Sequence, residues 1–253
     1  MSSQSCPFHI IIPARYASSR LPGKLLMDIG GQTVLERVYR QALLSKPSSI
    51  LIATDSEQIA NHAKTFGAEI RMTDADHPSG TERIAEVVRQ ERYSEDAIVV
   101  NVQGDEPFID PQLIQQVALI LFNKPALPMA TLCWPIQSLE QWHDPNTVKV
   151  ICDQQNRAMY FSRNAIPRDR HDANQFQAGM RHIGLYAYRA YFFQEMQSWP
   201  KSCLLADLEG LEQLRVLWMG YDIATEQACV APTVDINTHS DLMHARQMCH
   251  PKV

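Results

Sequence analysis

Long hydrophobic runs and an excess of basic residues are both missing from this sequence. Its longest uninterrupted apolar run covers residues 117–122, far short of the ~20 residues that a membrane-spanning helix needs. Its 23 basic and 28 acidic residues give a net charge of -5, which argues against a general nucleic-acid binder. We therefore expect no membrane segment and no nucleic-acid partner, and any anion site must be a local cluster of cations.

Closely spaced cysteine pairs and glycine-rich phosphate loops are also absent. The scattered cysteines argue against a structural zinc site or a thioredoxin-like redox site and favour buried thiols. Neither G-x-x-x-x-G-K-[ST] nor G-x-G-x-x-G occurs, which disfavours Walker-type and Rossmann-type nucleotide binding. The six cysteines are Cys6, Cys133, Cys152, Cys203, Cys229 and Cys249.

What the sequence does have is the composition of an ordinary globular protein. Hydrophobic residues make up 45% and charged residues 20% of its 253 residues, enough chain for a sizeable buried core. The first basic residue, Arg15, follows the apolar segment 8–12, so the charged start of a secretory signal is missing. We expect a cytoplasmic protein with one domain over residues 1–253.

The first half of the chain alternates short apolar segments with helical patterns. Such alternation predicts an α/β fold with a mostly parallel, doubly wound sheet, whose ligands bind at the carboxyl ends of the strands. Helix starts are indicated by Thr33 with Glu36, by Asp55 with Gln58 and by Asp110 before Pro111. The expected strands are residues 8–12, 50–54, 68–72 and 97–102.

The second half has a different pattern. Strand-like segments separated by short turns predict an antiparallel β subdomain inserted at about residues 130–200. A long helix is expected over residues 204–219, ending at Gly220, then a strand at 221–225 and a helix from about Thr238. The strand-like segments are residues 130–134, 147–152, 157–162 and 182–188.

Three cations follow the first strand directly. Arg15, Arg20 and Lys24 precede any acidic residue, and a loop at this place in a doubly wound sheet usually meets phosphate. With backbone N–H groups near Gly23 they could neutralise a triphosphate. A solvated basic loop is the alternative.

Two acidic positions could hold a metal ion. Asp105 follows the fourth expected strand and faces the same crevice as the basic loop, where Mg²⁺ takes one or two carboxylates plus phosphate oxygens and water. A second carboxylate, Asp235, precedes the last helix. The alternatives are a turn built on Gly104 and Pro107 and an acid flanking a helix.

Other polar segments carry weaker local signals. Ser79 and Gly80, near a helix start, suit capping or close contact with a base. The segments 160–163 and 181–186 suit an acidic, polyhydroxylated ligand, although a strand histidine is more often structural and a lone arginine often forms a surface ion pair. The segment 211–215 fits an amphipathic helix face equally well.

Taken in order, six segments resemble the CMP-Kdo synthetase family, the 3-deoxy-manno-octulosonate cytidylyltransferases. The resemblance runs from about Ile10 to Asp241. It implies a nucleotide-diphospho-sugar transferase-like fold, a homodimer, and transfer of CMP from CTP to the sugar acid Kdo, releasing pyrophosphate, in lipopolysaccharide synthesis. The segments are residues 13–24, 75–83, 102–107, 160–163, 181–186 and 211–215.

The resemblance also implies roles for individual residues. Arg15, Lys24, Asp105 and Asp235 match catalytic positions, and the last two match the Mg²⁺ ligands. The nucleotide-binding positions are Arg15, Arg20, Lys24, Ser79, Gly80, Arg83 and Asp105, and the sugar-acid positions are Gln103, Arg163, His182, Tyr186, Glu212 and Gln213.

The sequence departs from the family at three places. Pro78 stands where the family commonly has Gln, which bears on the cytosine contacts. Arg168 stands where Trp is frequent, and the segment before Leu211 carries one residue more.

Three other functions stay open at this point. The acceptor could be another acid sugar, such as a sialic acid or an amino analogue of Kdo. Asp74 and Asp76 form a D-x-D tripeptide that a metal-dependent glycosyltransferase would use, although a chain with 28 acids yields such spacings by chance. A non-catalytic module would bind CTP without turnover.

Overall fold

The computed structural model describes residues 6–18, 20–172, 174–200, 202–233 and 235–249. The strands are β1 (His9–Ala14), β2 (Ser49–Thr54), β3 (Glu69–Met72), β4 (Ile98–Asn101), β5 (Met129–Pro135), β6 (Lys149–Cys152), β7 (Ala158–Ser162), β8 (Met180–Arg189) and β9 (Ile223–Gln227). The helices are the 3₁₀ turn η1 (Lys24–Leu26), α1 (Val34–Leu44), α2 (Glu57–Thr65), α3 (Gly80–Glu91), α4 (Pro111–Asn123), α5 (Leu139–His143), α6 (Ala190–Ser198), α7 (Leu204–Glu209), α8 (Gln213–Trp218) and α9 (His239–Cys249).

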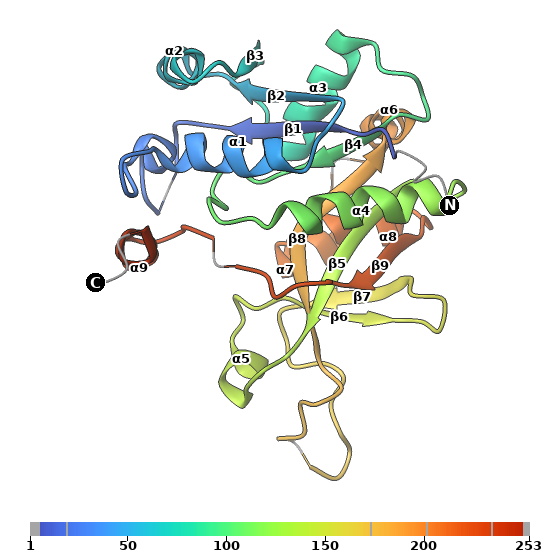
Figure 1. Cartoon of the computed structure of the whole chain (residues 1–253). Coiled ribbons are helices and arrows are strands. Elements are labelled where there is room, and N and C mark those ends of the chain that lie inside the picture. Colours follow the sequence, from blue (N-terminus) through green and yellow to red (C-terminus); the bar gives the residue numbers. More distant parts are fainter. Residues whose placement is uncertain (1–5, 19, 173, 201, 234, 250–253) are drawn as a thin grey trace, which may run out of the picture.

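A single sheet runs through the molecule in the order β3-β2-β1-β4-β8-β5-β9 (Figure 1). The first four strands are parallel to one another, and β8 lies antiparallel between β4 and β5. The α/β class and the mostly parallel sheet are therefore confirmed. The chain moves outward from β1 to β3 and returns on the other side of β1 at β4, so the switch point, where ligands bind in such sheets, lies between β1 and β4.

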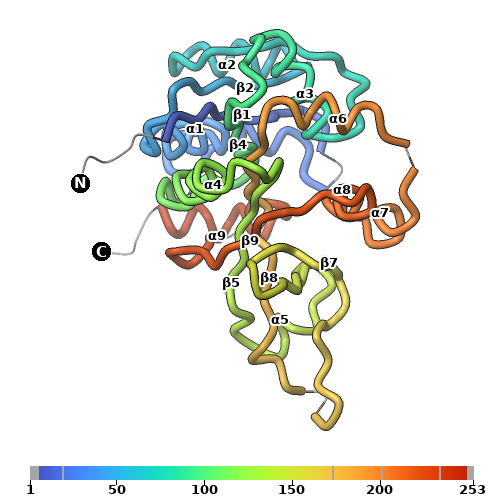
Figure 2. The backbone as a smooth tube through the Cα atoms, turned by 90° about the vertical axis from the view of Figure 1, so that its right-hand side faces the viewer, coloured from blue at the N-terminus to red at the C-terminus, as the bar shows by residue number. Residues whose placement is uncertain are grey.

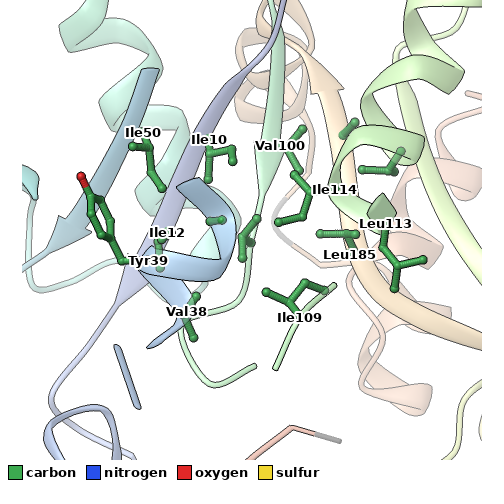
Figure 3. Packing of buried hydrophobic residues seen from close by; sticks show 14 of the residues in the cluster. Ile10, Ile12, Val38, Tyr39, Ile50, Val100, Ile109, Leu113, Ile114 and Leu185 are labelled. Atoms are coloured by element: carbon green, nitrogen blue, oxygen red, sulfur yellow. The ribbon is translucent and has the colours of Figure 1, made fainter. Parts of the chain in front are cut away.

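Alternate residues of β1 face two helical layers. Ile10 and Ile12 pack with Val38 of α1 and Leu113 of α4 on one face (Figure 3). Ile11 packs on the opposite face in the cluster that contains α3, α6 and α8 residues. Burying a side chain of this size contributes about 1.5–3 kcal/mol to stability. Because β1 is buried on both faces, its pairing register with β4 is fixed, and the carboxyl ends of the two strands lie at the same edge of the sheet.

The antiparallel part extends beyond the parallel part (Figures 1 and 2). β6 pairs with β7 and with the start of β8, and these strands, α5 and the segment after β7 project away from α1–α4. Since β8 also pairs with β4, one sheet joins the two parts. Among the described residues, no helix is both long enough and apolar enough to span a bilayer.

The structure corrects two expected helices. The N-cap of α2 is Ser56, whose hydroxyl accepts from the Ile59 N–H, rather than Asp55, because the Asp55 carboxylate faces the Arg83 guanidinium at 3.5 Å. The helix expected over 204–219 is two helices, because Gly210 has a left-handed φ of 61° and ends α7. The caps at Thr33 and Asp110 are confirmed by hydrogen bonds to following backbone N–H groups.

The cysteine expectation holds only in part. The six thiols are free, but only Cys133 and Cys203 are buried, and Cys229 is exposed. Cys229 lies just after β9, where the chain returns to the surface, and a scattered sequence pattern carries no information on that position.

Candidate active site

Two adjoining cavities lie at the carboxyl ends of β1 and β4. The first, the polar cavity, has a volume of about 240 Å³ and is bounded by the loop after β1, the turn after β4 and the start of α3. The second, the aromatic cavity, has a volume of about 310 Å³ and is bounded by α3, β8, α6 and α8. Gly80 and Gln103 line both cavities, so the two meet at the switch point of the sheet.

The three cations of the basic loop line the polar cavity together. Arg15 is exposed. Lys24 is held in place, with its Nζ atom 2.6 Å from an Asp105 carboxylate oxygen and 3.2 Å from Asn237 Oδ1. Arg20 Nη2 donates to the same Asn237 oxygen at 2.7 Å. The arrangement places positive charge where a polyphosphate could be neutralised.

The two predicted metal ligands lie on neighbouring segments. The Ile236 N–H donates to the Asp105 carbonyl at 2.9 Å, and the Asn237 amide donates to the Asp235 carboxylate. Burial, together with the charges of Asp105 and Asp235, raises the pKa of Glu106 to about 8. Asp105 lines the polar cavity, whereas Asp235 lines neither of the two cavities and borders a separate hollow against α9. The two carboxylates are near enough for both charges to act on Glu106, and they make this region beside the basic loop acidic.

This acidic region fits a hard divalent cation. Carboxylate oxygens are the protein ligands that Mg²⁺ takes, usually one or two of them, with phosphate oxygens and water completing the shell. Within the residues that the structure describes, no cluster of three or more His, Cys, Asp or Glu side chains could by itself hold a metal ion. The donor set therefore suits a cation that arrives with a phosphate-bearing substrate.

The walls of the polar cavity approach one another because two positions are glycine. A Cβ atom at Gly104 would lie 3.0 Å from the carbonyl oxygen of Pro13, and one at Gly80 would lie 3.3 Å from the Pro13 ring. A larger residue at either position would push the turn after β4 or the start of α3 away from the basic loop.

The start of α3 supplies the far wall of the polar cavity. Ser79 caps this helix by accepting from the Glu82 N–H at 3.2 Å. Arg83 is buried one turn later, where its guanidinium donates to the Thr73 hydroxyl and lies 3.5 Å from Asp55. Arg83 and the positive end of the helix dipole both favour an anionic ligand here.

The aromatic cavity contains one carboxylate that is held from two sides. Glu212 Oε1 accepts from the Ser79 hydroxyl at 2.9 Å, and Glu212 Oε2 accepts from the Thr81 hydroxyl at 3.0 Å. Desolvation raises the pKa of Glu212, and these two hydrogen bonds lower it in part. Other side chains on the wall are Tyr186, Tyr188, Phe193, Trp199 and Gln213.

Two predicted sugar-acid residues, Arg163 and His182, are not on the wall of either cavity. Arg163 donates from Nε to the Glu209 carbonyl at 2.6 Å and from Nη1 to the Pro145 carbonyl at 2.9 Å. His182 Nε2 lies 3.1 Å from the Thr131 hydroxyl, and burial lowers the pKa of this imidazole to about 3, so it is neutral. Their contacts with a sugar acid stay predictions.

The D-x-D tripeptide belongs to neither cavity wall. Asp74 and Asp76 are exposed, and the Asp74 carboxylate accepts from the Asp76 N–H at 3.0 Å in a local turn. The structure therefore gives no support to a glycosyltransferase metal site at this tripeptide.

Three residues of the site escaped the sequence reasoning. Thr81 and Glu106 lie inside the segments 75–83 and 102–107 that resemble the family, and Asn237 lies two residues after Asp235. Position in these segments was therefore an available signal, but the contact of Thr81 with Glu212 joins residues 131 positions apart and no local pattern predicts it.

Comparison with known proteins agrees with this geometry. The family model described as cytidylyltransferase matches residues 9–223. A relative from Legionella pneumophila strain Philadelphia 1, named 3-deoxy-manno-octulosonate cytidylyltransferase, is 57% identical over 240 residues that cover 95% of each chain. A relative of the same name from Aeromonas hydrophila is 50% identical over 250 residues, covering 95% of this chain and 98% of its own.

Solved structures match over almost the whole length. The structure of a CMP:2-keto-3-deoxy-manno-octonic acid synthetase complexed with CTP has a TM-score of 0.89 and 37% identity, covering 98% of this chain and all of its own. A glucose-1-phosphate thymidylyltransferase from Bacillus anthracis, at 17% identity and a TM-score of 0.65, shares the fold alone and covers 97% of this chain and 96% of its own. The chain therefore belongs to the cytidylyltransferase family, and within it to the 3-deoxy-manno-octulosonate cytidylyltransferases.

Proposed function

We propose that this protein transfers CMP from CTP to Kdo, giving CMP-Kdo and pyrophosphate for lipopolysaccharide synthesis. The observation that carries the proposal is the meeting of the polar and aromatic cavities at Gly80 and Gln103. One cavity offers cations to a triphosphate, and the other offers the Glu212 carboxylate as an acceptor for sugar hydroxyl groups. A nucleotide and a sugar bound in this way would bring the reacting groups together at the shared wall.

The reaction in this proposal is a direct displacement. The anomeric hydroxyl oxygen of Kdo forms a bond to the α-phosphorus of CTP, the bond from that phosphorus to the bridging oxygen breaks, and the hydroxyl proton is released. Positioning and charge neutralisation supply the catalysis, and no side chain forms a covalent intermediate. Arg15, Arg20 and Lys24 neutralise the triphosphate and stabilise the departing pyrophosphate.

In this proposal the base lies in the polar cavity and the sugar acid in the aromatic cavity, on the two sides of the wall that Gly80 and Gln103 share. Ser79, Gly80 and Arg83 border the cytidine, and Pro78 contributes no N–H donor there. Gln103, Tyr186, Glu212 and Gln213 surround the sugar acid, as lining residues of the aromatic cavity.

We propose Mg²⁺ as the cofactor, held by Asp105 and Asp235. When bound, Mg²⁺ would offset negative charge on the α-phosphate. The carboxylate of Asp105 also holds the Lys24 ammonium at 2.6 Å, so this residue would orient a cationic side chain as well as a metal ion. A homodimer that works in the cytoplasm, where CTP is available, completes the proposal.

The test is pyrophosphate release from CTP and Mg²⁺, with Kdo, an amino analogue of Kdo and a sialic acid supplied separately. Release with Kdo alone is the expected result. Release with another acid only would retain the nucleotidyltransferase chemistry and overturn the acceptor. CTP binding with no release from any acid would overturn the enzymatic function.

A further inference from the structure

Thr81 has a geometry that none of the assigned roles uses. Its side chain lines the aromatic cavity but not the polar cavity, and its hydroxyl donates to Glu212 Oε2 at 3.0 Å. Thr81 lies in the first turn of α3, and Glu212 immediately precedes α8. One hydrogen bond therefore joins the helix that walls the nucleotide site to the turn that carries the acceptor-site carboxylate.

The Glu212 carboxylate has lone pairs to spare after this contact. An ionised carboxylate offers about four acceptor positions, of which the hydroxyls of Ser79 and Thr81 take one on each oxygen. With both oxygens held, the carboxylate plane is fixed, and the remaining lone pairs have set directions. A polyhydroxylated acceptor needs such fixed directions, because its hydroxyl groups can donate to Glu212 while its own carboxylate is repelled.

We propose that Thr81 is a positioning residue that fixes the Glu212 carboxylate in the orientation that receives the hydroxyl groups of the acid sugar. This rests on the proposed function, in which the aromatic cavity binds the acceptor. Thr81 lines the aromatic cavity and not the polar cavity that the proposal gives to the nucleotide, and its other side-chain partner, Tyr188, belongs to the same aromatic cavity. Ser79, in contrast, holds Glu212 and caps α3 at the same time. The effect of Thr81 on substrate binding is therefore confined to the acceptor.

The kinetic test compares Thr81→Val with Thr81→Ser. The valine variant keeps the shape but loses the donor, and it should raise KM for the acid sugar about tenfold, the scale of one lost hydrogen bond to a charged group. KM for CTP should stay within about twofold, and serine should restore the wild-type value. Thr65→Val is the matched control, since the exposed Thr65 hydroxyl donates to the His62 carbonyl of its own helix, outside both cavity walls.

A second background separates positioning from general damage. Combined with Glu212→Gln, the change Thr81→Val should add less than about a twofold further rise in KM, because residues that act through one contact are not additive. The proposal would be overturned by any of three results: KM for CTP and KM for the acid sugar rise equally, Thr81→Ser does not restore the wild-type KM, or the effects of Thr81→Val and Glu212→Gln on KM multiply in the double variant.

The same hydrogen bond can be followed without turnover. Two charged side chains act on the pKa of Glu212: Glu82 on α3 raises it and Arg215 on α8 lowers it. Tyr186 and Tyr188 line the same cavity from β8. Removing the Thr81 donor should raise the pKa of Glu212 further, as measured by ¹³C NMR of the labelled carboxyl, and serine should not. An unchanged pKa of Glu212 in Thr81→Val overturns the positioning role, whether or not any acid sugar supports turnover. Absence of pyrophosphate release from the wild type with every acid sugar overturns only the proposed function.

Discussion

The parallel half of the sheet and its antiparallel extension build their shares of the site in different ways. In the parallel half, the functional side chains stand in the connections that follow strands: Lys24 at the start of η1 after β1, and Asp105 in the turn after β4. In the second half they stand on a strand face or a short turn between helices: Tyr186 on β8 and Glu212 before α8. A loop after a parallel strand is found by its place in the sequence, whereas a strand face is assembled by pairing between distant segments.

The two halves also differ in electrostatics. The polar cavity gathers Arg15, Arg20 and Lys24 against Asp105 in a setting open to water. Single groups with a suppressed charge occur in both halves, since burial lowers the pKa of His182 to about 3 and burial with nearby acids raises the pKa of Glu106 to about 8. The halves differ because the polar cavity gathers the three cations of the basic loop, whereas the aromatic cavity is lined largely by aromatic side chains. We therefore expect substitutions in the first half to act mainly on turnover, and substitutions in the second half to act on stability and on acceptor binding.

The largest expected effect is on turnover. Asp105→Asn should lower kcat by about 10³-fold, because it removes a charge that holds both the Lys24 ammonium and the proposed Mg²⁺. The measurement is steady-state pyrophosphate release at saturating CTP and Kdo.

The matched control for this prediction replaces Asp74 and Asp76 together by Asn. These exposed carboxylates lie outside both cavities, so kcat should change less than about twofold, as for most surface substitutions. Near-normal turnover in Asp105→Asn would contradict the two-carboxylate site, and a large loss in the control would revive the D-x-D tripeptide as a functional element.

A smaller effect, of about 2 kcal/mol, is expected on the pH dependence of stability. The His182 imidazole has a pKa of about 3 in the folded chain and about 6.5 when unfolded, so between these values the unfolded chain binds one proton more. Stability therefore falls as pH falls from 6.5, by about 2 kcal/mol at pH 5 from this group. The measurement is the free energy of unfolding in denaturant at pH 7 and at pH 5. The loss of this free energy between the two pH values should be about 2 kcal/mol smaller in His182→Gln than in the wild type.

His171→Gln is the matched control variant, since it makes the same substitution at an exposed position in the segment after β7. Its decline between pH 7 and pH 5 should equal that of the wild type. An unchanged decline in His182→Gln would show that the imidazole is not held neutral in solution.

The same contrast explains how far the sequence predicted this molecule. The parallel strands, the caps at Thr33 and Asp110 and the basic loop follow from local patterns, because each depends on residues a few positions apart. The break at Gly210 differs from the expected helix because the apolar periodicity continues through it, although a glycine inside a helical pattern is itself a local sign of a helix end. Lys149 shows the limit most clearly: it is fully buried and donates to the carbonyls of Asp144, Thr147 and Arg163, and no local pattern reports such a site.

Family resemblance implied the sugar-acid positions that local patterns could not predict, but a resemblance does not show how these side chains are oriented. It named Arg163 and Glu212 alike. The structure places Glu212 on the cavity wall, and it shows Arg163 tying the end of β7 to the turn before Glu212, while its contact with a sugar acid stays a prediction.

The smallest expected effect sharpens this last point. Arg163→Ala should raise KM for the sugar acid about tenfold while leaving kcat within about threefold, because the guanidinium bonds to the carbonyls of Glu209 and Gly210 hold the turn that presents Glu212. Arg157→Ala on the same hairpin is the control: its guanidinium pairs with Asp153 and Asp222, which are both partly exposed, and ion pairs near the surface contribute little. If Arg163→Ala instead abolished binding of the sugar acid, a direct contact between this guanidinium and the sugar carboxylate would be the better explanation. Equal, small changes in both variants would mean that the turn before Glu212 keeps its position without the Arg163 contacts.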